Sequence, residues 1–328
     1  MQKIDILNHL VCPECKCDLI KKDGGILRCS TCGNEYPIIN GIPRFVKDVL
    51  DTPTTRMFGY EWRHFSKLKN LYEQQFLDWL APVGEDFFRG KVVMDAGCGK
   101  GRHLYWAAQF GAKGVIGVDA SSAVDVAGIN VGSLENVYIV NADITRPPFG
   151  EVFDYIYSIG VIHHLNNPED GVKALAGCLK PDGVLSIWVY GKEGNRWVMT
   201  FLDPIRKKII KFLPFWLTKT FSYLITLPLF TVLRMVYLPA SRLPRNSYWR
   251  QLLFYQEYLC YISRFDFDEV FSIVFDQITA PVAHYSTSAE VKNWFKDAGL
   301  VNIHIAHHNN NSWRAYGVKQ PRRDSRNL

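Results

Sequence analysis

The stretch VVMDAGCGKGR at residues 92–102 decides the fold class of this chain. It begins with the apolar run Val92–Met94, which is typical of a short buried strand, and continues into a turn with glycine at every second position from Gly97 to Gly101. Such a turn lets the backbone approach a ligand closely at the carboxyl edge of a sheet. Its Gly-x-Gly-x-Gly spacing differs from the Gly-x-Gly-x-x-Gly of dinucleotide-binding proteins. The segment therefore predicts a strand followed by a ligand-binding loop.

Strand and helix signals alternate on the C-terminal side of this loop. Four further strand-like runs lie at residues 115–118, 137–140, 155–157 and 184–189. Near the end of the chain, Thr287 and Glu290 have the spacing of a helical capping box. Two closing strands are expected after that helix, at residues 301–306 and 313–318. This alternation predicts an α/β fold with a mainly parallel, seven-stranded sheet that is covered by helices on both faces.

Polar residues stand where the expected strands end. Asp119 closes the second strand, where a carboxylate can accept hydrogen bonds from ribose hydroxyls. Asp143 follows the third strand, where a carboxylate can accept from the exocyclic amine of adenine. The alternative is that both residues only cap helices after a strand, but their coincidence with the glycine loop favours a nucleoside-binding edge.

In residues 91–190 the chain resembles class I S-adenosylmethionine-dependent methyltransferases, most closely the ubiquinone and menaquinone branch. The resemblance is carried by the loop Asp95-x-Gly97-x-Gly99-x-Gly101, by Asp119, by Ala142-Asp143, by residues 158–165 and by Lys180-Pro181-Asp182-Gly183. Asp182 is a departure, because the family usually has glycine there. The resemblance implies a Rossmann-like fold, S-adenosylmethionine as the cofactor, and a cofactor site that consists of Asp95, Gly97, Cys98, Gly99, Asp119, Ala120, Asp143, Ile144 and Ser158.

The resemblance also implies a role for most of these residues. Gly97 and Gly99 would lie against the methionine end of the cofactor, with Asp95 near its ammonium group. Asp119 would bind the ribose, and Asp143 would bind the adenine amine. Of the remaining residues, Ile144 would lie against the adenine ring and Ser158 would line the pocket.

Two Cys-x2-Cys pairs precede the sheet. Cys12 and Cys15 are separated by thirteen residues from Cys29 and Cys32, and Gly24-Gly25 between the pairs favours a turn. Two such pairs can supply the four thiolates of a structural zinc site. The first fifty residues also resemble zinc-ribbon proteins that partner tRNA and translation-factor methyltransferases. The ribbon is expected to brace the main domain, and the alternative is that it recognises the substrate.

Methyl transfer requires a base only when the acceptor must lose a proton. His163 and His164 follow the fourth strand at the cofactor edge, and they are the candidate catalytic residues. The alternative is that they orient the loop or cap the next helix. Tyr190, His284 and Tyr285 border the same region and are weaker candidates.

The positive charge of the chain is concentrated in one segment. The whole chain carries a formal charge of +6, whereas residues 191–250 hold eleven basic and two acidic residues. Ile205, Ile209 and Phe212 predict an amphipathic helix with its basic residues on the other face. The sequence favours a lid whose apolar face packs on the domain. The alternatives, in order, are a lid that also contacts an anionic membrane through residues 196–240, and an RNA surface.

The chain thus divides into six segments. They are a zinc ribbon (1–48), a helical cofactor cover (49–90), the cofactor-binding core (91–190), a basic and apolar insertion (191–285), a closing helix and strands (286–319) and a disordered tail (320–328). An apolar content of 48% excludes disorder of the whole chain. No signal peptide or membrane-spanning segment is expected, since the longest uncharged apolar run, Thr220 to Leu233, has fourteen residues.

These observations predict a methyltransferase that acts on a small-molecule, lipid-linked or sugar-linked acceptor. An RNA methyltransferase guided by the ribbon and a non-catalytic cofactor-binding scaffold are the alternatives. The cysteine pattern predicts a reducing, cytoplasmic location, with the protein peripheral to the membrane if the insertion binds lipid.

Overall fold

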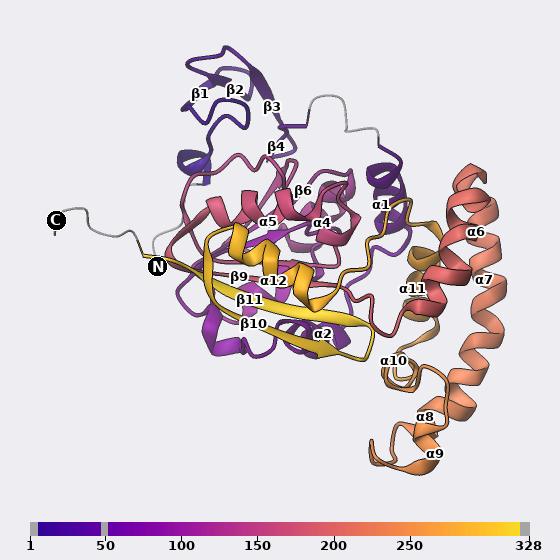
Figure 1. The fold of residues 1–328 in the computed structure, drawn as a ribbon. Coiled ribbons are helices and arrows are strands. Elements are labelled where there is room, and N and C mark those ends of the chain that lie inside the picture. Colours follow the sequence, from indigo (N-terminus) through magenta and orange to yellow (C-terminus); the bar gives the residue numbers. More distant parts are fainter. Residues whose placement is uncertain (1–5, 47–51, 322–328) are drawn as a thin grey trace.

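The computed structural model describes residues 6–46 and 52–321, so the tail predicted to be disordered lies almost entirely outside the described residues. A seven-stranded sheet forms the centre of the molecule, and helices cover both of its faces (Figure 1). The strand order is β10-β11-β9-β8-β5-β6-β7, and β11 is antiparallel to both of its neighbours whereas the pairs among β5 to β9 are parallel. The predicted mainly parallel, seven-stranded Rossmann-like fold is confirmed.

The strands of this sheet follow the predicted runs with one extension. They are β5 (Val92–Ala96), β6 (Gly114–Asp119), β7 (Val137–Asn141), β8 (Phe153–Ile159), β9 (Leu179–Tyr190), β10 (Leu300–His308) and β11 (Ser312–Lys319). β9 begins five residues earlier than predicted, because the turn that contains Asp182 lies within the strand. Asp182 has a φ of +63°, a left-handed conformation that glycine adopts at lower cost, which explains why glycine is usual at this position.

Two hydrophobic clusters lie on opposite faces of the sheet. On one face, α2 (Leu71–Leu80), α3 (Arg102–Gln109) and α4 (Ala123–Val131) pack with Val93. On the other face, α5 (Pro168–Gly177) and α12 (Ser288–Asp297) pack with Met94. Consecutive residues of β5 therefore enter different cores, as the two-residue period of a strand requires. The predicted capping box of Thr287 and Glu290 is present at the start of α12.

The N-terminal unit is a second, antiparallel sheet. Its elements are a short 3₁₀ helix (Ile6–His9), β1 (Leu19–Lys22), β2 (Ile26–Cys29), β3 (Glu35–Ile39) and β4 (Ile42–Pro43). The backbone N–H of Phe45 donates to the carbonyl of Asn141 in β7 at 2.8 Å, and Lys16 Nζ donates to the carbonyl of Pro147 at 2.6 Å. Tyr36 and Phe45 belong to the same cluster of buried side chains as the central sheet. These contacts favour a brace that is fixed to the edge of the sheet at β7.

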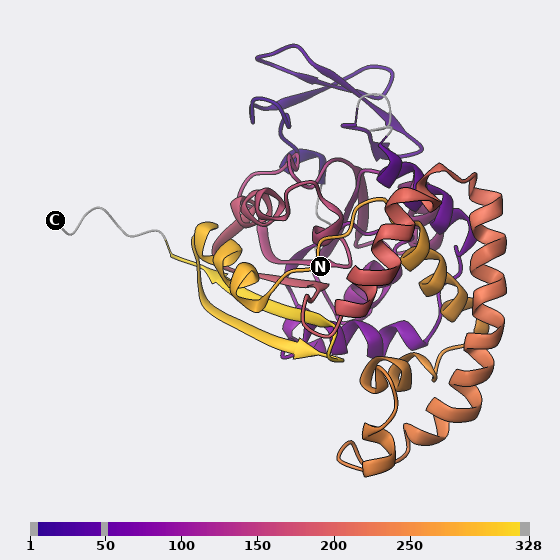
Figure 2. The same ribbon diagram turned by 45° about the vertical axis from the view of Figure 1, so that its right-hand side comes forward.

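Most of the remaining helices form a layer beside the carboxyl edge of the sheet (Figure 2). They are α1 (Pro53–His64), a 3₁₀ helix (Ile162–His164), a π-helical turn (Val198–Leu202), α6 (Asp203–Lys208), a 3₁₀ turn (Ile210–Phe212), α7 (Phe215–Val232), the π-helical turn η6 (Leu233–Tyr237), α8 (Leu238–Ala240), α9 (Tyr248–Gln251), α10 (Gln256–Ile262) and α11 (Phe267–Thr279). A further 3₁₀ helix, Glu85–Phe88, directly precedes β5 and lies at the amino edge of the sheet. α7, η6 and α8 join into one helix from Phe215 to Ala240. This helix is much longer than the fourteen-residue run expected from the sequence, because Arg234 lies inside it rather than at its end.

The orientation of the insertion corrects one expectation. Ile205 and Ile209 are 47% and 55% exposed, and Phe212 is 74% exposed. Arg206, which was expected on the solvent side, is 1% exposed and forms an ion pair with Asp203. The prediction that the apolar face of this segment packs on the domain is therefore wrong. The pair with Asp203 neutralises the buried guanidinium and makes the inward position of Arg206 tolerable.

Candidate functional site

A cavity of about 680 Å³ lies at the carboxyl edge of the sheet, beneath the helical layer. Its floor includes the glycine loop and the ends of β6 and β7. Its walls come from α1, α2 and α11, and from the last residues of β9. The carboxyl edge of a parallel sheet is the usual ligand-binding position in this type of fold.

The glycine loop has a backbone that other residues adopt only with strain. Gly97 has a φ of +87°, and a Cβ atom there would lie 2.2 Å from the side chain of Val161. Gly99 has a φ of +50°, and its Cβ would lie 2.9 Å from Trp62. The loop thus requires glycine both for its conformation and for the close approach of two neighbouring side chains.

The two predicted carboxylates stand at the strand ends. Asp119 accepts from the N–H of Gly99 at 2.9 Å and from the N–H and hydroxyl of Ser121 at 2.8 and 2.7 Å, which holds it against the loop. Burial raises the pKa of Asp119 above its ordinary value. Asp143 is half-buried, and one of its oxygens accepts from the N–H of Thr145 at 2.8 Å. Both residues line the cavity.

Seven of the nine residues predicted for the cofactor line this cavity: Gly97, Cys98, Gly99, Asp119, Ala120, Asp143 and Ile144. Two do not. Ser158 is completely buried, and its hydroxyl donates to the carbonyl of Ala96 at 2.8 Å. Asp95 lies below the loop with both carboxylate oxygens buried and without a hydrogen-bond partner among the described residues, and burial raises its pKa well above the ordinary value. The structure therefore places these two behind the cavity wall.

A group of charged side chains beside the loop was not found from the sequence. Glu61, Lys100, Arg102 and Glu269 all line the cavity. Lys100 Nζ donates to the carbonyl of Phe65 at 2.6 Å, and burial lowers the pKa of this lysine to about 8. Burial raises the pKa of Glu61 well above the ordinary value, and its Oε2 has no partner within the described part of the chain. The group offers both signs of charge next to the loop.

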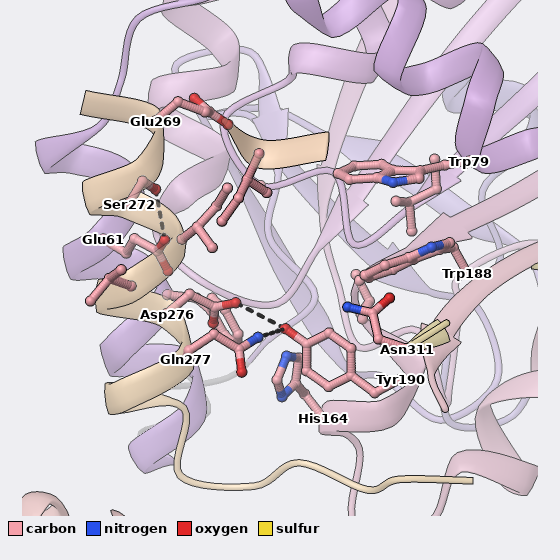
Figure 3. A pocket seen from close by; sticks show the side chains of 18 of the residues that line it. Glu61, Trp79, His164, Trp188, Tyr190, Glu269, Ser272, Asp276, Gln277 and Asn311 are labelled. Atoms are coloured by element: carbon pink, nitrogen blue, oxygen red, sulfur yellow. Dashed lines mark hydrogen bonds between the residues drawn. The ribbon is translucent and has the colours of Figure 1, made fainter. Parts of the chain in front are cut away.

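A second polar cluster in the cavity surrounds Tyr190 (Figure 3). Tyr190, the last residue of β9, donates its hydroxyl to Asp276 Oδ2 at 3.2 Å and accepts from Gln277 Nε2 at 2.7 Å. Burial raises the pKa of Asp276 above its ordinary value, and its buried Oδ1 has no partner in the described residues. The pKa of Tyr190 is also raised by burial, so its hydroxyl stays protonated at neutral pH. Asp276 therefore has an oxygen that can accept a proton, whereas Tyr190 does not.

The two histidines proposed from the sequence differ in position. His164 lines the cavity, and its Nδ1 pairs with the carbonyl of Val282, so Nδ1 carries the proton and Nε2 keeps its lone pair. Burial lowers the pKa of His164, which favours this neutral form. His163 is fully buried, contacts Tyr190 in a tilted arrangement with ring centroids 3.9 Å apart, and is not among the cavity-lining residues. Only His164 is placed where it can reach a ligand.

Asp276 and Glu61 illustrate what the sequence did not reveal. Ser272, on α11, donates to Glu61 at 3.1 Å although the two residues are 211 positions apart. Asp276 lies on the same helix between buried apolar residues such as Phe275 and Ile278. An acidic residue inside an apolar run of a helix was the available signal, because it requires a partner when the helix is buried.

The four paired cysteines meet at one point in the N-terminal unit. The sulfur atoms of Cys12, Cys15, Cys29 and Cys32 all lie within 4.8 Å of one another. The Cys12–Cys32 and Cys15–Cys29 sulfur distances are 3.6 and 3.4 Å. A tetrahedral zinc ion with Zn–S bonds of about 2.3 Å requires sulfur separations of about 3.8 Å. The geometry therefore fits the predicted structural zinc site.

Comparison with known proteins agrees with this geometry. The family model described as a methyltransferase domain matches residues 94–187. The chain is similar to tRNA U34 carboxymethyltransferase of Methylococcus capsulatus, with 32% identity over 139 residues that cover 41% of this chain and 40% of the relative. It is also similar to the enzyme of the same name from Pseudoalteromonas translucida, with 32% identity over 110 residues that cover 33% and 34% of the two chains. The chain thus spans less than half of the length of these curated relatives.

Among solved structures, the chain is similar to magnesium protoporphyrin IX methyltransferase of Synechocystis with bound SAH. The sequence identity is 14%, the TM-score is 0.47, and the match covers 82% of this chain and all of the other.

Proposed function

We propose that this chain binds S-adenosylmethionine and transfers its methyl group to an acceptor. The proposal starts from the match of the methyltransferase-domain family model to residues 94–187. The main observation behind the proposal is that the glycine loop, Asp119 and Asp143 line the same cavity. A nucleoside fits the two carboxylates, which accept from hydroxyls and amines. When bound, the sulfonium of the cofactor supplies an activated methyl group.

The charged group beside the loop suits the amino acid end of this cofactor. An α-amino acid carries a carboxylate and an ammonium group, and the cavity wall offers Arg102 and Lys100 for the first and Glu61 for the second. The unpartnered Oε2 of Glu61 supports this assignment, since a buried polar atom without a partner is costly unless a ligand satisfies it. An ammonium ion next to Glu61 would also favour its ionised form.

The Tyr190 cluster is proposed to hold the acceptor. Asp276 and His164 both line the cavity, and each presents an acceptor atom beside Tyr190 (Figure 3). Since the methyl group is already activated, most of the acceleration can come from positioning the acceptor and excluding water. Asp276 would remove a proton where the acceptor group is a hydroxyl or a protonated amine.

We expect Asp276→Asn to lower kcat by about a hundredfold or more, because an amide cannot accept the proton at a base position. Burial raises the pKa of Asp276, so wild-type activity should fall as the pH decreases through the pKa of this carboxyl group. The Asp276→Asn variant should lose this acidic limb of the pH–rate profile. His164→Gln serves as the comparison, since it removes the other acceptor atom. If His164→Gln abolishes the limb while Asp276→Asn retains it, the base is His164. If both variants keep the wild-type rate and profile, the acceptor needs no base.

The names of the curated relatives support an RNA acceptor better than the small-molecule acceptor expected from the sequence, because two of them are tRNA carboxymethyltransferases. A lipid-linked acceptor is the second candidate. It is supported by Ile225 and Val232 of α7, which are exposed and also line the cavity, so the cavity opens along an apolar helix. Incubation with cofactor labelled in its methyl group, followed by separation of RNA, lipid and soluble small molecules, tests the two. Label in RNA supports the first candidate, and label in lipid supports the second.

We also propose that the four clustered cysteines hold one structural zinc ion and that the protein works in a reducing, cytoplasmic compartment. The cluster uses all four positions of a tetrahedral ion, which leaves none for chemistry. Cys98, Cys178 and Cys260 are buried free thiols, and this is common where disulfides do not form.

A further inference from the structure

The exposed apolar side chains of this protein are concentrated in one segment. Among the described residues, 18 of the 21 large hydrophobic side chains that are exposed lie between positions 201 and 254. Phe212, Trp216, Met235 and Trp249 are each between 66% and 74% exposed. The segment includes α6, α7 and α9, which lie together at one side of the molecule (Figure 2). We call these exposed side chains of residues 201–254 the apolar face. Exposed apolar side chains gathered in one segment indicate a binding surface.

The helix α7 is oriented with its polar side inward. Its fully buried residues are Thr218, Ser222 and Thr226, which are at most 1% exposed. Each hydroxyl donates to the carbonyl four residues earlier, at 3.3, 2.9 and 2.7 Å, and so requires no other partner. α7 runs along α11, where Tyr223 and Phe271 contact each other edge to face (Figure 1). A surface helix in water shows the reverse arrangement, with apolar residues inward.

Positive charge predominates in this segment, which favours an anionic binding partner. No Asp or Glu occurs between Asp203 and Glu257, whereas nine Lys and Arg residues do. The exposed Lys208 precedes α7, and the exposed Arg242 follows α8. Exposed Trp216 lies near the start of the long helix and exposed Trp249 beyond its end. Apolar residues between cations and tryptophans match a lipid bilayer, whose acyl chains, anionic headgroups and interface they would meet.

The apolar face points to docking in the plane of the membrane rather than to spanning it. The best 18-residue window of the helix Phe215–Ala240 has a mean hydropathy of 1.6, so this helix is long and apolar enough to span a membrane by length and composition alone. However, Arg234 donates to the carbonyls of Ser263 and Phe265 at 3.3 and 3.0 Å, and Phe230 of α7 packs edge to face against Phe267 of α11. A spanning helix would have to abandon both attachments.

We propose that the apolar face of residues 201–254 docks on a bilayer that contains anionic phospholipid. Two copies of the face would repel each other, because each has unbalanced positive charge. An RNA surface would combine its cations with aromatic rings that stack on bases, whereas ten of the 18 side chains of this face are aliphatic and offer no stacking surface. Docking would bring the α7 side of the cavity next to the lipid. The proposal does not depend on the nature of the methyl acceptor.

Co-sedimentation of the full chain with vesicles tests this inference. We expect binding to vesicles of phosphatidylcholine with phosphatidylglycerol, weaker binding to phosphatidylcholine alone, and further weakening at high salt. The triple variant Trp216→Ser, Met235→Ser, Trp249→Ser should bind at least about tenfold more weakly, since it removes three side chains that would insert. These residues are exposed, so the fold should tolerate the change. Ile129→Ser is the matched control, because Ile129 is 85% exposed on α4, outside the face.

Four results would overturn the proposal. The first is that the wild type does not bind anionic vesicles, and the second is that the triple variant binds them as well as the wild type does. The third is that bound protein resists an alkaline carbonate wash, which indicates a spanning helix. The fourth is that the wild type binds tRNA in a salt-sensitive manner and the triple variant loses this binding rather than lipid binding. Calorimetric titration of every variant with S-adenosylmethionine separates this outcome from failure of the proposed enzymatic function, because the three exposed side chains do not line the cavity.

Discussion

Replacement of Gly97 by arginine is expected to abolish S-adenosylmethionine binding, to below detection by isothermal titration calorimetry. Gly97 has a φ of +87°, and any Cβ at this position would lie 2.2 Å from Val161. The loop would have to move away from the cavity floor to relieve this overlap, and a long charged side chain would then occupy the space for the ligand. Gly177→Ala is the control, because a Cβ at this residue in α5 meets no atom within 4 Å.

Asp119→Ala keeps the prediction testable if the Gly97→Arg chain does not fold. Asp119 lines the cavity and also anchors Gly99, so its removal should weaken binding by about 10- to 100-fold. Circular dichroism establishes whether each variant is folded. Wild-type affinity in a folded Gly97→Arg or Asp119→Ala chain would contradict the cofactor site. Absence of binding by the wild type would contradict the proposed function as a whole.

The second large effect is expected from loss of the metal. Metal analysis should find one zinc ion per chain, and the double variant Cys29→Ser, Cys32→Ser should contain none. Structural zinc contributes on the order of 10 kcal/mol in small domains of this type, so residues 6–46 should lose their fold. The melting temperature of the whole chain should also fall, because Tyr36 and Phe45 are part of the core of the central sheet.

Cofactor binding should weaken in the same variant. Phe45, at the end of the ribbon, donates its backbone N–H to the carbonyl of Asn141 in β7. Asp143, which lines the cavity, is only two residues further along the chain. The matched control is Cys17→Ser, because Cys17 lies in the ribbon but outside the four-cysteine cluster. Zinc retained by the double variant, or lost equally by Cys17→Ser, would contradict the assignment of the ligands. An unchanged melting temperature in the zinc-free chain would contradict the bracing role.

The side of the cavity that we propose for the cofactor was largely predictable because its parts are local in the sequence. The glycine loop, Asp119 and Asp143 each follow a recognisable strand, and the carboxyl ends of parallel strands meet at one edge. Asp95 and Ser158 follow the same pattern, yet they lie behind the wall. The position of a residue at the end of a strand shows that it lies near the carboxyl edge of the sheet. Whether its side chain reaches the cavity depends on how the loop packs.

The acceptor side was not predictable in the same way. Tyr190 closes β9, but its partners Asp276 and Gln277 come from α11, more than eighty residues later. The pair of Glu61 and Ser272 joins still more distant segments. Nothing in the local pattern of either helix specifies the other, since contacts at such separation depend on how the insertion folds over the sheet.

The sequence by itself determined the parallel sheet, the strand ends that line the cavity and the four cysteines that cluster, because each depends on short spacings that constrain the backbone locally. Only the tertiary structure decided which face of the insertion packs against the body of the protein. The spacing of Ile205 and Ile209 identifies an apolar face, but an apolar face can be covered by the protein or by another apolar phase. In this fold the buried pair of Arg206 with Asp203 and the hydroxyl row of α7 take the inner positions. The apolar residues are therefore left on the outside, where a membrane can cover them.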